Sequence, residues 1–169
     1  MAEIIKIRPL ELSDKTPLAK IADNKKVWNN LRDYIPSPYN ESDAEFFIRL
    51  TKQEKPPQNF GIEYKGEICG VIGLIIQQDV YRKSAEIGYW LGEDYWGKGI
   101  ATKAVELITE YGFKTLHLIR IYTGVFEFNI ASMKVLEKND YIKEGIFKKA
   151  VFKNGKLWDE HRYYKLHKQ

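Results

Sequence analysis

Residues 85–113, AEIGYWLGEDYWGKGIATKAVELITEYGF, decide how this chain is organised. Residues 85–91 form a short, largely apolar run that predicts a strand. Residues 101–116 predict a helix with one charged face and one apolar face, the latter made of Ala101, Ala104, Val105, Ile108 and Tyr111 with Gly112. The pattern therefore predicts a strand that passes through a glycine-containing loop directly into an amphipathic helix.

The loop at residues 96–101, Trp-Gly-Lys-Gly-Ile-Ala, is suited to bind an anion such as a pyrophosphate. Gly97 and Gly99 leave backbone amides uncovered, the helix start adds free N–H groups and the positive end of its dipole, and Lys98 adds a charge. It is not a Walker loop, because the Gly-Lys-Ser/Thr ending is missing. A glycine turn that serves only tight strand-to-helix packing is the alternative interpretation.

The rest of the strand pattern predicts a mixed sheet. Strands are expected at residues 4–8, 60–64, 68–76 and 118–126. The clearest hairpin signal joins residues 147–153 to residues 156–166 through Asn154 and Gly155, the pair typical of a type I′ turn.

Three further helices are indicated by their start signals. Ser13 and Asp14 are candidate caps for the first, and Asn129 is the candidate cap of a helix that ends at residue 138. A capping box over residues 42–45 indicates the start of the other, and Phe46, Phe47 and Leu50 follow it on the helix. The order is one strand, two helices, three strands, a helix, a strand, a helix and a hairpin, which predicts an α+β fold.

Composition excludes several classes of protein. The chain has 169 residues, 44% hydrophobic and 30% charged, which excludes a wholly disordered chain and favours one domain over residues 1–169. The net charge of +4 is too small to indicate a nucleic-acid partner. The single Cys69 excludes an internal disulfide framework and a multi-cysteine zinc site. Without a long apolar run or a signal-peptide pattern, a cytoplasmic protein with no membrane partner is expected.

From about residue 60 to residue 166 the chain resembles the GNAT superfamily of acetyl-CoA-dependent N-acetyltransferases. The resemblance is carried by GIEYKGEICGVIGL at 61–74, the stretch at 85–113, and NIASMKVLEKNDYIKEGIFKKAVFKNGKLWDEHRYYKL at 129–166. The RimJ/RimL branch, which acetylates ribosomal-protein N-termini, is the most similar. The resemblance implies a mostly antiparallel sheet of about seven strands with about four helices, splayed between residues 85–91 and 118–126.

The resemblance also implies direct transfer of an acetyl group from acetyl-CoA to a primary amine in a ternary complex, without a metal. The family's pyrophosphate loop begins with Gln or Arg, and here that position is Trp96. The other residues of the expected cofactor loop are Gly97, Lys98, Gly99, Ile100, Ala101 and Thr102. The backbone of the strand segment Tyr89, Trp90 and Leu91 is expected to pair with the pantetheine arm.

Two residues are candidates for catalysis by the same resemblance. Glu86 is the candidate base, acting through water, and an ion pair with a nearby Lys or Arg is the alternative. Asn129 and Ser132 match the branch's Asn-x-x-Ser motif, in which Asn contacts the cofactor and Ser lies near its sulfur. Ser132 is the candidate donor to the departing thiolate, and helix capping is the alternative for both residues.

The chain departs from the family at two catalytic positions. Leu136 stands where many members carry a catalytic Tyr, and Val151 stands where RimL-type enzymes carry a Glu. These departures leave a non-catalytic acetyl-CoA-binding module as one alternative function. An RNA-associated domain, based on the lysines within residues 143–156, is another.

The amine acceptor is not identified by the sequence. Trp28, Arg32 and Tyr34 are candidates for lining its pocket, with ordinary packing as the alternative. A protein N-terminus, a polyamine and an aminoglycoside all remain open, and a polycation would be favoured by an acidic pocket that includes Glu41, Asp43 and Glu45. Strand pairing through the C-terminal hairpin leaves both a monomer and a homodimer open.

Overall fold

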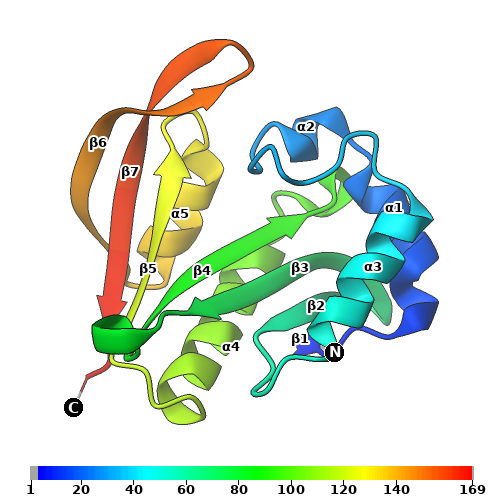
Figure 1. Ribbon diagram of the computed structural model, residues 1–169, viewed down its shortest axis with the longest axis horizontal. Coiled ribbons are helices and arrows are strands. Elements are labelled where there is room, and N and C mark those ends of the chain that lie inside the picture. Colours follow the sequence, from blue (N-terminus) through cyan, green and yellow to red (C-terminus); the bar gives the residue numbers. More distant parts are fainter. Residues whose placement is uncertain (1–3, 169) are drawn as a thin grey trace.

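One mixed sheet of seven strands forms the centre of the molecule (Figure 1). The computed structural model describes residues 4–168. The strands are β1 (Ile5–Arg8), β2 (Asn59–Tyr64), β3 (Glu67–Ile76), β4 (Ser84–Leu91), β5 (Arg120–Phe126), β6 (Ile142–Lys153) and β7 (Lys156–Leu166), in the spatial order β1-β2-β3-β4-β5-β7-β6. Only β4 and β5 pair in parallel; the other neighbouring strands are antiparallel. The predicted α+β fold is confirmed.

Helices cover both faces of this sheet (Figure 1). They are α1 (Lys15–Ala22), α2 (Lys25–Trp28), α3 (Glu41–Thr51), α4 (Ile100–Lys114) and α5 (Ile130–Lys138), with short 3-10 helices at Leu12–Asp14, Asp79–Tyr81 and Glu93–Tyr95. A smaller core, which includes Leu18 and Ile48, lies under α1 and α3, and a larger one, which includes Val105 and Leu136, lies under α4 and α5. Within residues 4–168, no helix is long and apolar enough to cross a membrane.

Helix α4 packs on the sheet through the apolar face that the sequence predicts. Ala104, Val105 and Ile108 are fully buried. Gly112 lets the helix approach the strands closely, because a Cβ there would lie 2.8 Å from Leu74 Cδ1 and 2.9 Å from Ile121 Cδ1. This packing fixes the helix, and with it the loop from which the helix starts, against the end of β4.

The sheet divides between β4 and β5, as expected. The two strands pair only over residues 84–86 and 120–122, and beyond this point they diverge (Figure 1). Because the strands are parallel, their carboxyl ends and the loops that follow lie on the same side of the molecule. The opening between them is therefore bordered by the glycine loop after β4 and by the start of α5 after β5.

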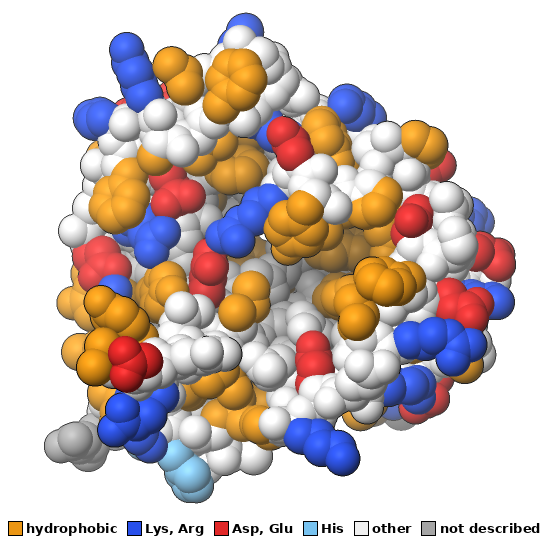
Figure 2. Space-filling view, viewed as in Figure 1, with side chains coloured by type: hydrophobic (Ala, Val, Ile, Leu, Met, Phe, Trp, Pro, Cys, Tyr) orange, Lys and Arg blue, Asp and Glu red, His pale blue; other side chains and the backbone are white. Residues whose placement is uncertain are grey.

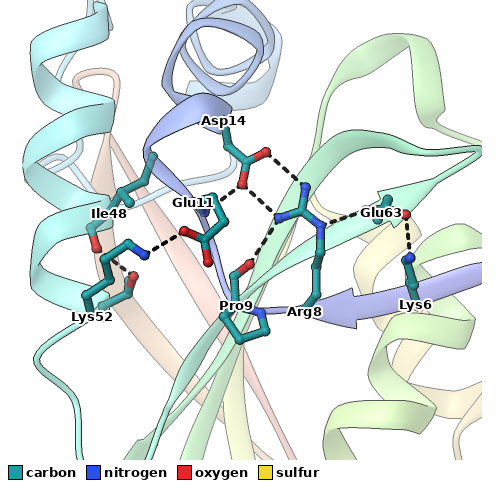
Figure 3. Close-up of polar contacts among 9 residues, drawn as sticks. Lys6, Arg8, Pro9, Glu11, Asp14, Ile48, Lys52 and Glu63 are labelled. Carbon is teal, nitrogen blue, oxygen red and sulfur yellow. Dashed lines mark hydrogen bonds and ion pairs between the residues drawn. The ribbon is translucent and has the colours of Figure 1, made fainter.

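An ion cluster ties β1 to the segments that follow it (Figure 3). Arg8 binds Asp14 through two hydrogen bonds, Nη1 to Oδ2 at 2.8 Å and Nη2 to Oδ1 at 2.9 Å. Its Nε donates to Glu63 on β2 at 2.6 Å, and Lys6 binds the same carboxylate at 2.9 Å. Asp14 also accepts the backbone N–H of Glu11. Its carboxylate is thus occupied and does not cap α1, contrary to the prediction.

Helix α3 begins at a different cap from the predicted one. Asn40 is the N-cap, and its side chain accepts the backbone N–H groups of Ser42 and Asp43. The capping box expected over residues 42–45 is wrong, because Ser42 already lies inside the first helical turn. Asn40 and Ser42 are both good cap residues, so composition alone does not choose between them.

The two-residue difference in cap position does not change the helix, which has two apolar stripes of which one is buried. Phe46 and Leu50 are exposed, whereas Ala44 and Ile48 are fully buried. Both sets repeat at helical spacing, and only the position of the sheet decides which face is covered.

The C-terminal hairpin has the predicted turn. Asn154 and Gly155 have φ angles of 52° and 73°, the positive values that a type I′ turn requires. Its first strand is longer than predicted, because β6 begins at Ile142 rather than at residue 147 and its pairing with β7 is interrupted between Phe147 and Val151.

Candidate active site

Two adjoining cavities open where β4 and β5 diverge. Figure 2, which has the same view as Figure 1, shows a hollow near the centre of the molecule, rimmed by hydrophobic side chains. The loop cavity has a volume of about 360 Å³ and is bordered by residues 95–102 and by α5. The sheet cavity has a volume of about 230 Å³ and lies over β3, β4 and β5. Both are lined by Asn30, Leu31, Tyr89, Trp90, Asn129 and Ser132. The shared lining makes them two parts of one cleft.

The glycine loop lines the loop cavity, and two of its residues have a backbone conformation that favours glycine. Gly97 and Gly99 have φ angles of 72° and 75°, in the left-handed region that favours glycine. Gly99 is the N-cap of α4, and the first backbone bond of the helix runs from Lys103 N to Gly99 O at 3.2 Å, so the amides of residues 100–102 precede it. A Cβ on either glycine would meet no heavy atom within 4 Å. The loop thus combines two open glycines with the start of a helix, as an anion-binding loop requires.

All charged side chains that line the loop cavity, within the described chain, are lysines. Lys98 belongs to the loop, and Lys134 and Lys138 lie on neighbouring turns of α5. Together with the start of α4 they make the cavity positive, which suits a ligand with several phosphate groups. Lys134 and Lys138 were not predicted, although their i,i+4 spacing after the Asn129 cap was a usable signal.

Trp96 occupies the loop position where the family carries Gln or Arg. Its indole Nε1 donates to the backbone oxygen of Leu91 at 2.9 Å, and its side chain borders the loop cavity. The indole therefore ties the glycine loop to the end of β4. It uses its only hydrogen-bond donor within the protein, whereas the loop amides beyond it stay open.

A pair of hydroxyl groups lies where the two cavities meet. Tyr89 Oη is 2.8 Å from Ser132 Oγ and donates to the Ser132 carbonyl oxygen at 3.2 Å. Burial raises the pKa of Tyr89 well above its ordinary value, so this phenol stays protonated. Asn129 borders both cavities and also caps α5 by accepting the Ser132 backbone N–H at 3.3 Å. The structure thus brings three predicted site residues together.

Glu86 lies beside the cleft but borders neither cavity. It shares a strand face with Gly88 and Trp90, which do line the sheet cavity. Its carboxylate is paired with Arg32 from the segment after α2, and the Glu86 side chain is 18% exposed. The ion pair considered as the alternative is therefore present, and a role as base requires a bridging water.

Two of the three predicted acceptor-pocket residues, Arg32 and Tyr34, border the sheet cavity. Trp28 borders neither the loop cavity nor the sheet cavity. Its Nε1 donates to the Ile35 backbone oxygen at 2.9 Å, and the ammonium groups of Lys25 and Lys153 lie 3.8 and 3.2 Å from its ring centroid. Trp28 therefore stabilises the segment after α2, which contributes Arg32 and Tyr34 to the lining of the sheet cavity.

Glu160 on β7 borders the sheet cavity and was not predicted as a site residue. Its Oε1 accepts a hydrogen bond from Arg162 Nη1 at 2.9 Å. The carboxylate extends over Gly124 of β5, where an added Cβ would lie only 2.3–2.6 Å from it. This position depends on the pairing of β5 with β7, and no local motif reveals it.

Comparison with known proteins identifies the family. Residues 5–142 match the family model described as an acetyltransferase (GNAT) domain. The Bacillus subtilis protein "Putative ribosomal N-acetyltransferase YdaF" is 36% identical over 172 residues, which cover 99% of this chain and 93% of that protein. The spermidine N(1)-acetyltransferase of Escherichia coli strain K12 is 28% identical over 180 residues, which cover 99% and 92%.

A solved structure supports the same relationship. The crystal structure of the microcin C7 self-immunity acetyltransferase MccE, in complex with acetyl-CoA and AMP, matches with a TM-score of 0.82 at 29% identity. The match covers 99% of this chain and 94% of that chain. The resemblance noted in the sequence is confirmed, and the chain belongs to the GNAT family of N-acetyltransferases.

Proposed function

We propose that this chain transfers the acetyl group of acetyl-CoA to a primary amine, with both substrates bound at once in the cleft between β4 and β5. The observation that carries the proposal is that two unlike cavities meet at Tyr89 and Ser132. One is positive and bordered by a glycine loop, and the other is bordered by the carboxylate of Glu160 and by the aromatic rings of Phe47 and Phe126. Two substrates that meet at this junction can react directly, without an enzyme-bound acetyl intermediate.

Acetyl-CoA fits the loop cavity by charge and by backbone geometry. The free amides at the start of α4 and the lysines Lys98, Lys134 and Lys138 suit its phosphate groups. The backbone of β4 beyond Glu86 no longer pairs with β5 and is available to the pantetheine arm. The acetyl-CoA named in the MccE structure supports the same ligand for this chain.

In the reaction the amine nitrogen forms a bond to the thioester carbon, and the carbon–sulfur bond breaks. The attacking amine loses one proton, and the departing thiolate takes one up. Ser132 lies at the junction and is the proposed donor to the sulfur, while the protonated Tyr89 hydroxyl is within 2.8 Å of Ser132 Oγ and can donate to it. The pair is proposed to hydrogen-bond the sulfur as it leaves, and the thiolate then takes its proton from water.

The proton that the amine loses needs an acceptor, and Glu86 is the proposed base, acting through water. Neutralising an α-amino group at pH 7 costs about 1.4 kcal/mol, and an amine of pKa about 10.4 costs about 4.6 kcal/mol. Glu86→Gln is therefore expected to lower the rate most at low pH. Glu144→Gln is the matched control, because Glu144 is also paired with an arginine, Arg120, but borders neither cavity. An unchanged pH–rate profile for Glu86→Gln would exclude this base.

Calorimetric titration with acetyl-CoA tests the proposed function first. We expect one-to-one binding in the micromolar range and release of CoA when an amine is added. Replacing both Lys98 and Lys134 with Ala should weaken acetyl-CoA binding about 10-fold and reduce its dependence on salt. Lys103→Ala is the control, because Lys103 is paired with Glu106 on the exposed face of α4. No binding at millimolar acetyl-CoA would refute the proposal. Binding without CoA release, for any amine in a broad panel, would leave a non-catalytic binding module.

A further inference from the structure

We propose that the acceptor is a small monoamine with an apolar, preferably aromatic body, and that Glu160 binds its amino group. This inference rests on the proposed acetyl transfer and defines the chemical class of its second substrate. It follows from the charge, shape and size of the sheet cavity.

The charges around the sheet cavity leave one open carboxylate oxygen. Among the described lining residues only Arg32 and Glu160 are charged, and Arg32 is paired with Glu86. Glu160 receives its hydrogen bond from Arg162 on Oε1, so Oε2 remains for a ligand. Each ion pair is neutral within itself, so the cavity presents a single carboxylate to an amine rather than a strongly negative field.

A polyamine would need more than this site offers. Each additional ammonium group buried without a carboxylate or other acceptor carries a large desolvation penalty. The acidic residues at the start of α3 do not provide such partners, because Glu41, Asp43 and Glu45 border neither cavity. Asp43 accepts the Asn40 backbone N–H, and the Glu45 carboxylate binds lysine and arginine side chains of the protein. The acidic pocket that would have favoured a polycation is therefore not part of the cleft.

Part of the remaining lining of the sheet cavity suits an apolar, flat body. Phe47, Trp90 and Phe126 contribute aromatic rings, and Val71 and Ile75 contribute aliphatic groups. Gly88 leaves the β4 part of the floor open, because an added Cβ there would meet no heavy atom within 4 Å. The cavity has a volume of about 230 Å³, and its aromatic rings suit a small acceptor with a flat body.

Steady-state kinetics with three acceptors tests this class: phenethylamine, spermidine, and a tripeptide with an N-terminal Phe. We expect kcat/KM for phenethylamine to exceed the other two values by at least about 10-fold. Glu160→Gln should raise the KM for phenethylamine about 10-fold and leave acetyl-CoA binding unchanged. Asp159→Asn is the control, because Asp159 is the neighbouring residue, is paired with Lys148, and borders neither cavity. A preference for spermidine or for the tripeptide would overturn the inference.

A titration without turnover separates this inference from the proposed function. Phenethylamine is added to the full chain saturated with CoA, and binding is followed by calorimetry. Saturable binding that Glu160→Gln weakens and Asp159→Asn does not would support the assigned class, and no binding would overturn it. If no amine is acetylated at all, the proposed function fails, and this titration still decides which ligand the sheet cavity accepts.

Discussion

The Tyr89 hydroxyl lies 2.8 Å from the Ser132 hydroxyl, at the point where the loop cavity and the sheet cavity meet. A second hydroxyl pair of the same kind joins Thr109 to Tyr141, also at 2.8 Å, away from both cavities. The two pairs share their chemistry and differ in their place. Comparing them separates an effect on the reaction from an effect on stability.

Ser132→Ala is expected to lower kcat about 100-fold, because the departing sulfur loses its hydrogen-bond donor. The dissociation constant of acetyl-CoA should change little, since Ser132 is proposed to act on the leaving group. Tyr89→Phe should lower kcat in the same direction but less, because Ser132 keeps its hydroxyl. Steady-state rates and calorimetry measure the two quantities separately.

Thr109→Val and Tyr141→Phe remove the control pair. Both variants are expected to lower the melting temperature and to keep kcat at the wild-type value, because neither residue borders the cleft. Full activity of Ser132→Ala, or an equal loss of kcat in the control variants, would contradict the role assigned to Ser132.

Local signals in the sequence predicted those parts of the fold that a few adjacent residues determine. The Asn154-Gly155 turn and the apolar face of α4 follow from backbone preference and helical period, and both are confirmed. The predicted cap of α3 was wrong, because two good cap residues lie two positions apart, and its buried face could not be predicted, because two apolar stripes compete. The contact with the sheet determines which stripe is buried, and the local sequence does not specify that contact.

The residues of the candidate site also fall into two groups: those that a local motif predicted and those that no local motif marks. The loop from Trp96 to Thr102 is one continuous segment, so its residues were predicted together and all line the loop cavity. Glu160 reaches the sheet cavity only because β7 pairs with β5 and Gly124 leaves room for its carboxylate. A residue that enters a site through long-range strand register has no local pattern that marks it.

Lys153 is a positioning residue for the segment that lines the cleft. It is 2% exposed, and its Nζ donates to the Leu31 backbone oxygen at 2.8 Å and to Asp33 at 2.7 Å. Lys153→Met keeps the apolar stem and removes these bonds, so the free energy of unfolding should fall by about 2 kcal/mol. Because Leu31 borders both cavities, the KM for the amine should rise as well. Chemical denaturation and acceptor kinetics measure the two effects.

Lys156→Met is the control for that substitution. Lys156 lies opposite Lys153 across the hairpin turn and is exposed. The same change there should leave both the stability and the KM unchanged. A stable Lys153→Met variant with wild-type kinetics would show that the segment around Leu31 is held by other contacts.

Gly99→Ala tests the backbone shape of the loop. Its φ of 75° costs a residue with a Cβ about 1–2 kcal/mol, so the loop should shift or the protein should lose that stability. We expect acetyl-CoA binding to weaken about 10-fold, since a 1.4 kcal/mol change is tenfold in affinity. Gly145→Ala is the control, because that glycine has no neighbour within 4 Å and no positive φ. Unchanged acetyl-CoA affinity in Gly99→Ala would mean that the loop amides do not bind the ligand.

Asp14 gives a pH-dependent test of the ion cluster around Arg8. Burial alone would raise the pKa of Asp14, but the Arg8 side chain and the Glu11 backbone N–H together lower it below its ordinary value of 3.8. A carboxylate with a lowered pKa in the folded state adds stability above its unfolded pKa, and this stability is lost as the pH falls through the folded pKa. Asp14→Asn should therefore lower the free energy of unfolding by about 2 kcal/mol at pH 7.

The difference in stability between the wild type and Asp14→Asn should be constant above about pH 5. It should shrink below pH 3.8, where the carboxylate of the unfolded chain becomes protonated first, and it should be lost below the lower pKa of the folded state. Urea unfolding over a series of pH values measures this difference. Glu110→Gln is the control, because Glu110 forms an exposed i,i+4 pair with Lys114 and such pairs add little. A difference that persists unchanged into strong acid would show that Asp14 stabilises the fold through its shape and packing, because the charge would then have no part in it.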